Sequence, residues 1–201
     1  MEIDLDKADW GKGDGLLPAI VQDAVSGRVL MLGYVNREAV TQTLATGLVT
    51  FYSRSKQRLW QKGETSGHAL RLRDMRIDCD SDTFLMLADP QGPTCHTGTQ
   101  SCFGDGIAPQ WAVMGDLAAT IKNRRTHPEK GGYTASLFAA GLTRIAQKVG
   151  EEGVETALAA ATRGPNLADE AADLLYHLLV LIEAADMDMA QVLDVLRARK
   201  K

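Results

Sequence analysis

The stretch that decides the fold reads DCDSDTFLMLADPQGPTCHTGTQSC, residues 78–102, because strand-like sequence precedes it and helix-like sequence follows it. All three cysteines of the protein lie within it: Cys79, Cys95 and Cys102. Three aspartates surround the first cysteine: Asp78, Asp80 and Asp82. Thiolates are soft ligands that bind zinc, whereas carboxylates are hard ligands that bind magnesium or calcium. The stretch therefore predicts two chemically different metal sites side by side.

A strand over residues 78–82 would point the aspartates to one face and Cys79 to the other. Three cysteines without an evident fourth ligand favour a catalytic zinc, which keeps one coordination position for water. Two alternatives remain open at this point: cysteines that serve as small buried hydrophobic residues, and aspartates in a solvated loop. His96 is a fourth ligand, a general base or an ordinary loop histidine.

Composition places the chain among soluble globular proteins. Its 201 residues are 45% hydrophobic and 24% charged, and the net charge of −4 argues against a nucleic-acid-binding surface. An odd number of cysteines favours a reducing compartment over a secreted disulfide framework. The acidic start of the sequence predicts no signal peptide, and no apolar run approaches the length of a membrane span. We therefore expect a cytoplasmic protein without a membrane partner.

The sequence predicts two domains, residues 1–107 and 108–201, with the boundary in the Gly- and Pro-containing run 104–109. In the first domain Asn36 should cap a helix that ends at Gly47. The predicted strands cover residues 19–25, 28–35, 48–55, 69–77 and 83–88. In the second domain, apolar residues three and four apart predict helices over residues 111–125, 135–163, 167–185 and 189–199. Gly141 should break or kink the second of these helices, and Asn166 should cap the third.

Residues 58–68 are polar and rich in glycine, which predicts a loop between strands. Arg58 and Lys62 could bind a phosphate, the backbone of residues 65–67 could add N–H donors, and Trp60 could stack on a base. A flexible surface loop is the alternative.

A second group of carboxylates lies on two predicted antiparallel helices. Glu152 and Glu155 are three residues apart, as are Glu170 and Asp173, so each pair shares a helical face. Leucines around Asp173 predict a largely buried helix, on which a carboxylate is costly unless it is paired or binds a metal. The group therefore predicts a Mg²⁺ site for a phosphate substrate, and a solvated acidic stripe is the alternative. Arg144 and Lys148 could hold the phosphates; His177 is a core histidine or a functional one.

The motifs together resemble two known families. The first half resembles phosphoribosyl-AMP cyclohydrolase in residues 31–34, 51–54, 59–68, 78–82 and 92–96. The second half resembles phosphoribosyl-ATP pyrophosphohydrolase in residues 133–134, 148–152, 155 and 170–177. The resemblance implies a bifunctional hydrolase of histidine biosynthesis. It implies an α+β first domain that is dimeric with a mostly antiparallel sheet, and an all-α second domain of the nucleotide pyrophosphohydrolase type.

The resemblance also implies residue roles. Cys79, Cys95 and Cys102 would bind zinc, with Cys79 and the other two cysteines contributed by different subunits of a homodimer. Asp78, Asp80 and Asp82 would bind Mg²⁺, as would Glu152, Glu155, Glu170 and Asp173. His96 would shuttle protons, and Glu152 and Glu155 would be catalytic. Substrate would contact Arg58, Trp60, Lys62, Glu64, Ser66, His68, Arg144 and Lys148. The second domain would release pyrophosphate from phosphoribosyl-ATP, and the first would open the adenine ring at N1–C6. Two other hypotheses are a general nucleotide pyrophosphohydrolase with a regulatory zinc domain, and a non-catalytic zinc-stapled dimerisation module.

Overall fold

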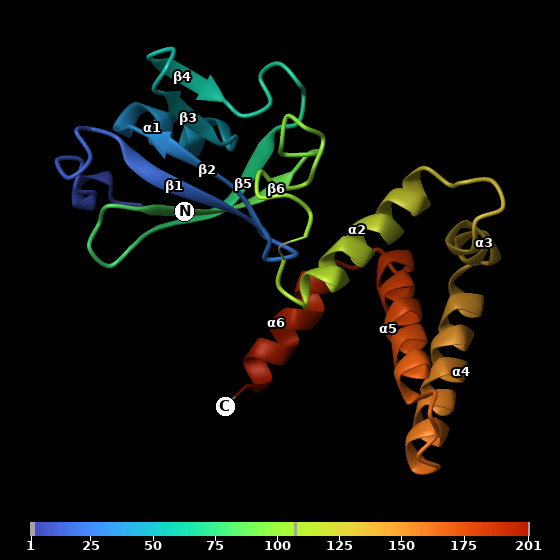
Figure 1. The fold of residues 1–201 in the computed structure, drawn as a ribbon. Helices are drawn as coiled ribbons and strands as arrows, with labels where there is room; N and C mark the ends of the chain where they lie inside the picture. Colours follow the sequence, from blue (N-terminus) through green and yellow to red (C-terminus); the bar gives the residue numbers. More distant parts are fainter. Residues whose placement is uncertain (1–2, 107, 201) are drawn as a thin grey trace. The chain divides into compact units, whose positions relative to one another are not determined.

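The computed structural model describes residues 3–106 and 108–200, and it divides into two compact units, Met1–Val113 and Met114–Lys201 (Figure 1). The sequence predicted a domain boundary between residues 107 and 108. Residue 107 lies outside the described residues, so this boundary stays a prediction. No helix among the described residues is long and apolar enough to cross a membrane.

The first unit is built on a mixed four-stranded sheet. Its strands are β1 (Leu17–Asp23), β2 (Val29–Val35), β5 (Leu70–Ile77) and β6 (Phe84–Pro90), in the order β2-β1-β6-β5. β1 and β6 are parallel, whereas β1–β2 and β5–β6 are antiparallel. A separate antiparallel pair comprises β3 (Thr50–Ser53) and β4 (Arg58–Gln61), and the helices are η1 (Leu5–Lys7) and α1 (Arg37–Thr46).

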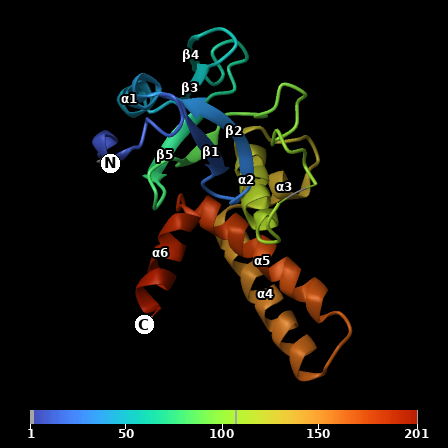
Figure 2. The same ribbon diagram turned by 60° about the vertical axis from the view of Figure 1, so that its left-hand side comes forward.

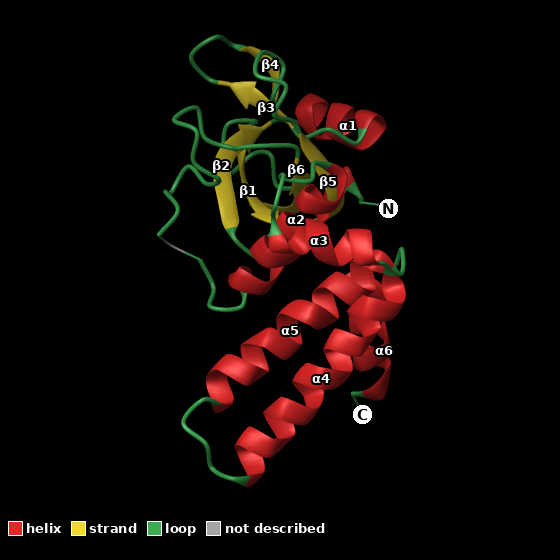
Figure 3. Ribbon diagram, turned by 90° about the vertical axis from the view of Figure 1, so that its right-hand side faces the viewer, coloured by secondary structure: helices red, strands yellow, loops and turns green. Residues whose placement is uncertain are grey.

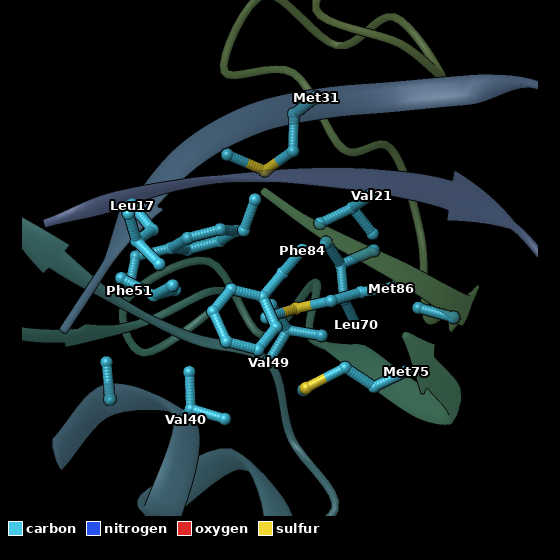
Figure 4. Packing of buried hydrophobic residues seen from close by; sticks show 14 of the residues in the cluster. Leu17, Val21, Met31, Val40, Val49, Phe51, Leu70, Met75, Phe84 and Met86 are labelled. Carbon is cyan, nitrogen blue, oxygen red and sulfur yellow. The ribbon is translucent and has the colours of Figure 1, made fainter. Parts of the chain in front are cut away.

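The local signals in this unit are the expected ones. The Asn36 side chain accepts a hydrogen bond from the Ala39 N–H, and Gly47 ends α1 in the left-handed conformation, as the sequence predicted. One face of the sheet packs against α1 and β3 in a core that contains Phe51, Phe84 and Met86 (Figure 4). Phe51 also explains why residue 33 is a glycine, because a Cβ at Gly33 would lie 2.3 Å from the Phe51 ring.

The second unit is helical. Its elements are α2 (Ala112–Thr126), which starts just before the unit does, α3 (Tyr133–Ala140), α4 (Leu142–Ala161), α5 (Leu167–Ala184) and α6 (Met189–Arg199). α4 and α5 lie side by side and antiparallel (Figures 2 and 3). Gly141 divides α3 from α4 with φ 86°, which confirms the predicted break. The core of this unit contains Ile121, Leu137, Ile145, Leu179 and Val180.

Four local predictions were wrong. Residues 78–82 form a turn and bend between β5 and β6, so no strand alternation separates the aspartates from Cys79. Residues 58–61, expected in a loop, form β4. The third predicted helix, α5, is buried only towards its C-terminal end, at His177, Leu179, Val180 and Ile182, whereas Asp173 and Leu175 are exposed. Asn166 occupies the N-cap position without a side-chain capping bond, and its amide donates to Glu170 instead.

Candidate metal centres

The acidic turn is the first candidate centre. Asp78, Asp80 and Asp82 each offer an oxygen, and these oxygens lie within 4.8 Å of one another. Asp78 Oδ1 accepts the backbone N–H of Asp82 at 3.0 Å, which helps to fold the turn over it. The Lys12 ammonium lies 3.1 Å from Asp80 Oδ2 and 3.2 Å from Asp82 Oδ2. Three carboxylates are hard oxygen donors, so the donor set fits a hard cation, which would take the place of the Lys12 ammonium.

A cavity of about 490 Å³ lies beside residues 60–68 and the cysteine loop. It brings together most of the residues that the sequence predicted for substrate and zinc in the first unit. They are Trp60, Lys62, Glu64, Ser66, His68, Cys95, His96 and Cys102. Arg58 does not line it; its guanidinium Nη2 lies 2.6 Å from Glu64 Oε1, and this ion pair fixes Glu64 at the rim.

The two thiols of the cavity differ in their proton affinity. The Thr97 hydroxyl donates a hydrogen bond to Cys95 Sγ at 3.1 Å and, with the Thr97 backbone, lowers the Cys95 pKa to about 6. Burial and the neighbouring Cys95 raise the pKa of Cys102. Lys62 is only 7% exposed, and burial lowers its pKa, although both thiols oppose this effect. The lowered pKa of Cys95 favours its thiolate form, which is the form that binds zinc.

Cys79 is placed differently from the other cysteines. It is exposed in the turn between β5 and β6. Within the described residues of one chain, the groups of three or more close metal-ligating side chains are carboxylates, and none contains the three cysteines together. One chain therefore supplies two thiols in one cavity and a third on a separate turn.

Trp60 has only one ring face available for a ligand. Its ring stacks on Phe51 with 5.7 Å between the ring centres and 28° between the planes, which occupies one face. The cavity meets the remaining surface of the indole.

The second candidate centre lies between α4 and α5. Glu152, Glu155 and Glu170 offer oxygens within 4.8 Å of one another, whereas Asp173 is exposed and lies outside this group. Glu152 is only 5% exposed, and the Lys148 ammonium lies 2.6 Å from its Oε1. Lys148 lowers the pKa of Glu152, whereas burial and the neighbouring carboxylates raise the pKa of Glu155. Such mutual repulsion is relieved by a divalent cation, so the donor set fits Mg²⁺.

The predicted phosphate-binding cations on α4 already have partners. Arg144 Nη1 lies 3.1 Å from Glu151 Oε1, and Lys148 lies 3.1 Å from Glu151 Oε2. Glu151 thus links both cations beside the carboxylate group. Spacing along the helix revealed these cations. It gave no sign of the 2.9 Å hydrogen bond between the Tyr133 hydroxyl and Nε2 of the buried His177, whose Nδ1 lies 3.7 Å from Glu152 Oε1.

Two family models match the chain. The model described as Phosphoribosyl-AMP cyclohydrolase matches residues 31–104, and the model described as Phosphoribosyl-ATP pyrophosphohydrolase matches residues 114–200. The chain is similar to Histidine biosynthesis bifunctional protein HisIE of Salmonella typhimurium, with 57% identity over 192 residues, 95% of this chain and 94% of that protein. The protein of that name from Escherichia coli (strain K12) is 56% identical over the same shares. That of Shewanella oneidensis is 55% identical over 197 residues, 98% of this chain and 92% of that protein.

Proposed function

Because the chain belongs to the bifunctional HisIE family, with phosphoribosyl-AMP cyclohydrolase and phosphoribosyl-ATP diphosphatase activities, we propose a set of residues for each reaction. In this proposal the second unit acts first and releases pyrophosphate, and the first unit then opens the adenine ring of phosphoribosyl-AMP. The enzymatic assignment makes the hypothesis of a non-catalytic dimerisation module wrong. Both substrates are small metabolites, and we place the reactions in the cytoplasm.

The cyclohydrolase reaction takes place in the cavity that contains Cys95, Cys102 and His96. Cys95 and Cys102 hold zinc there, and zinc, when bound, lowers the pKa of water towards neutrality and makes it a nucleophile. Water adds to C6 of the substrate purine and the N1–C6 bond opens. His96, next to Cys95 at the exposed side of the cavity, takes the proton from water and returns one to N1. Lys62, His68 and the free side of Trp60 orient the substrate.

A second copy of the chain supplies Cys79. The reason is geometric, because Cys79 stands on a separate turn from the cavity thiols. The outer face of the sheet supports this homodimer: Leu32 and Leu85 flank Ile20 across β2, β1 and β6, and both leucines are exposed. Exposed neighbouring apolar side chains on one face are typical of an interaction surface. The acidic turn that carries Cys79 holds Mg²⁺ through Asp78, Asp80 and Asp82.

The diphosphatase reaction takes place between α4 and α5. Glu152, Glu155 and Glu170 hold Mg²⁺, and Asp173, one turn after Glu170, joins them through another side-chain rotamer. Mg²⁺, when bound, neutralises the charge that develops on the phosphates. Glu155, whose pKa is raised, is the member best suited to accept a proton from the attacking water. Arg144 and Lys148, held beside Glu151, meet the phosphate chain.

The observation that carries this proposal is the joint cavity of Cys95, Cys102, His96 and Lys62, matched in the second unit by the three clustered glutamates. The test is to incubate the purified protein with phosphoribosyl-ATP and to measure pyrophosphate and ring-opened product separately. Glu155→Gln should stop pyrophosphate release, and Cys95→Ala should stop only ring opening. Unchanged pyrophosphate release in Glu155→Gln would remove the glutamate site from the proposal. A panel of ordinary nucleoside triphosphates tests the alternative of a general pyrophosphohydrolase, which requires one of them to outcompete phosphoribosyl-ATP.

A further inference from the structure

We propose that His177 is a positioning residue of the diphosphatase site and that Tyr133 holds it in the required orientation. The inference rests on the proposed function of the second unit. His177 lies in α5 and is only 4% exposed, so its ring nitrogens need partners inside the protein. None of the steps proposed above uses this buried histidine.

Two hydrogen bonds fix the imidazole. Nδ1 lies 2.9 Å from the backbone carbonyl oxygen of Asp173, and because a carbonyl oxygen only accepts, Nδ1 carries the proton. Nε2 lies 2.9 Å from the Tyr133 hydroxyl oxygen. In the neutral ring Nε2 has no proton and accepts the hydrogen bond of that hydroxyl. The partners at the two ends of the ring therefore determine both its tautomer and its direction.

The protonated edge of His177 faces Glu152. Nδ1 lies 3.7 Å from Glu152 Oε1, the same oxygen that the Lys148 ammonium contacts at 2.6 Å. Lys148 therefore binds Oε1 directly, whereas Nδ1–H is donated to Asp173 and His177 acts on Oε1 through packing and the positive edge of its ring. Removing a group that orients a metal ligand typically costs about 10- to 100-fold in metal affinity or activity. Tyr133, at the first turn of α3, thus reaches the metal ligand on α4 through His177.

A purely structural role for His177 and Tyr133 would be to tie α3 to α5. The chain contains a second hydroxyl contact that ties the same two helices together. The Thr134 and Tyr176 hydroxyl oxygens lie 2.8 Å apart and join the same turn of α3 to the same helix. From Thr134 the hydrogen bonds continue to Arg124 on α2, and the Tyr176 ring, whose centre lies 5.0 Å from that of His177, is kept when Tyr176 becomes Phe. Tyr176→Phe therefore also removes a phenol hydroxyl from a contact between α3 and α5, and it serves as the control for Tyr133→Phe.

The experiment measures Mn²⁺ binding to the full chain by calorimetry without substrate. The Mn²⁺ binding that belongs to the glutamate site is the component of the binding curve that Glu152→Gln abolishes. Tyr133→Phe should weaken this component about tenfold, whereas Tyr176→Phe should leave it unchanged at a similar loss of thermal stability. His177→Asn, whose amide N–H replaces Nδ1–H, should retain more affinity than His177→Gln. In pyrophosphate release, Tyr133→Phe should raise the Mn²⁺ concentration needed for half-maximal rate and leave the KM for phosphoribosyl-ATP unchanged.

Equal Mn²⁺ affinity in Tyr133→Phe and Tyr176→Phe would overturn the inference while the glutamate site stands. Mn²⁺ binding that survives Glu152→Gln without loss would overturn the glutamate site and the inference with it. Ring opening of phosphoribosyl-AMP reports on the other unit and should be the same in every variant.

Discussion

Gly33→Ala should damage the first unit through a single methyl group. The new Cβ would lie 2.3 Å from Phe51 Cδ1 and 2.5 Å from Cε1, distances that real contacts do not reach, so the ring must move. Phe51 is only 1% exposed and has no solvent to move into. Overpacking of this kind costs about 2 kcal/mol. For a unit of this size, that corresponds to a fall in melting temperature of roughly 8–10 °C.

The displacement should also reach the cavity, because Phe51 stacks on Trp60, which lines it. Calorimetry should show the transition of the first unit moving alone, and ring opening should fall while pyrophosphate release is unchanged. Gly150→Ala is the matched control: it lies within α4, a Cβ there meets nothing within 4 Å, and alanine should stabilise the helix by about 0.5–1 kcal/mol. If Gly33→Ala unfolds at the wild-type temperature with full ring-opening activity, the packing argument is wrong.

The charges at the two sites lead to three further predictions. In metal-free protein, the rate at which Cys95 reacts with iodoacetamide should rise with pH with a midpoint near pH 6. Thr97→Val should raise that midpoint, because the Thr97 hydroxyl stabilises the thiolate. An unchanged midpoint would exclude Thr97 as the cause of the lowered Cys95 pKa. Removal of metals by a chelator should abolish both activities. Mg²⁺ alone should then restore pyrophosphate release, whereas ring opening should also require zinc. Recovery of ring opening with Mg²⁺ alone would contradict the zinc site at the thiolates. Arg125→Ala should destabilise the second unit, because Arg125 on α2 forms ion pairs with Glu183 and Asp186. In urea denaturation, added salt should reduce the difference in unfolding free energy between the variant and the wild type. A difference that does not depend on salt would indicate lost packing instead.

Much of the fold was predictable because local signals and tertiary structure agree. The β5 sequence alternates apolar and charged residues, Asn36 and Gly47 bound α1, and the positive φ of Gly141 breaks a helical run. β4 was missed because it has only four residues, none of them fully buried, and forms a separate two-stranded pair with β3, so its sequence is too short for a period to stand out.

The sites were predictable in their ligand types and less so in their geometry. Cysteines and spaced carboxylates indicate metal chemistry from the sequence. The cavity depends on contacts between Lys62 and the cysteine loop, far apart along the chain, which spacing does not contain. Helical periodicity placed Asp173 on the face of Glu170, but the carboxylates that lie within 4.8 Å of one another do not include it. The Tyr133–His177 contact joins two helices and has no signature in either one alone.

The measurement that tests the two-site account most directly is complementation between single-site variants. Glu155→Gln alone should leave phosphoribosyl-ATP intact, and Cys95→Ala alone should accumulate phosphoribosyl-AMP and pyrophosphate. Mixed together, the two variants should convert phosphoribosyl-ATP fully to the ring-opened product, because each retains the site that the other lacks. A mixture that stops at phosphoribosyl-AMP, or a Glu155→Gln variant that is unable to open the ring of added phosphoribosyl-AMP, would contradict independent sites on the two units.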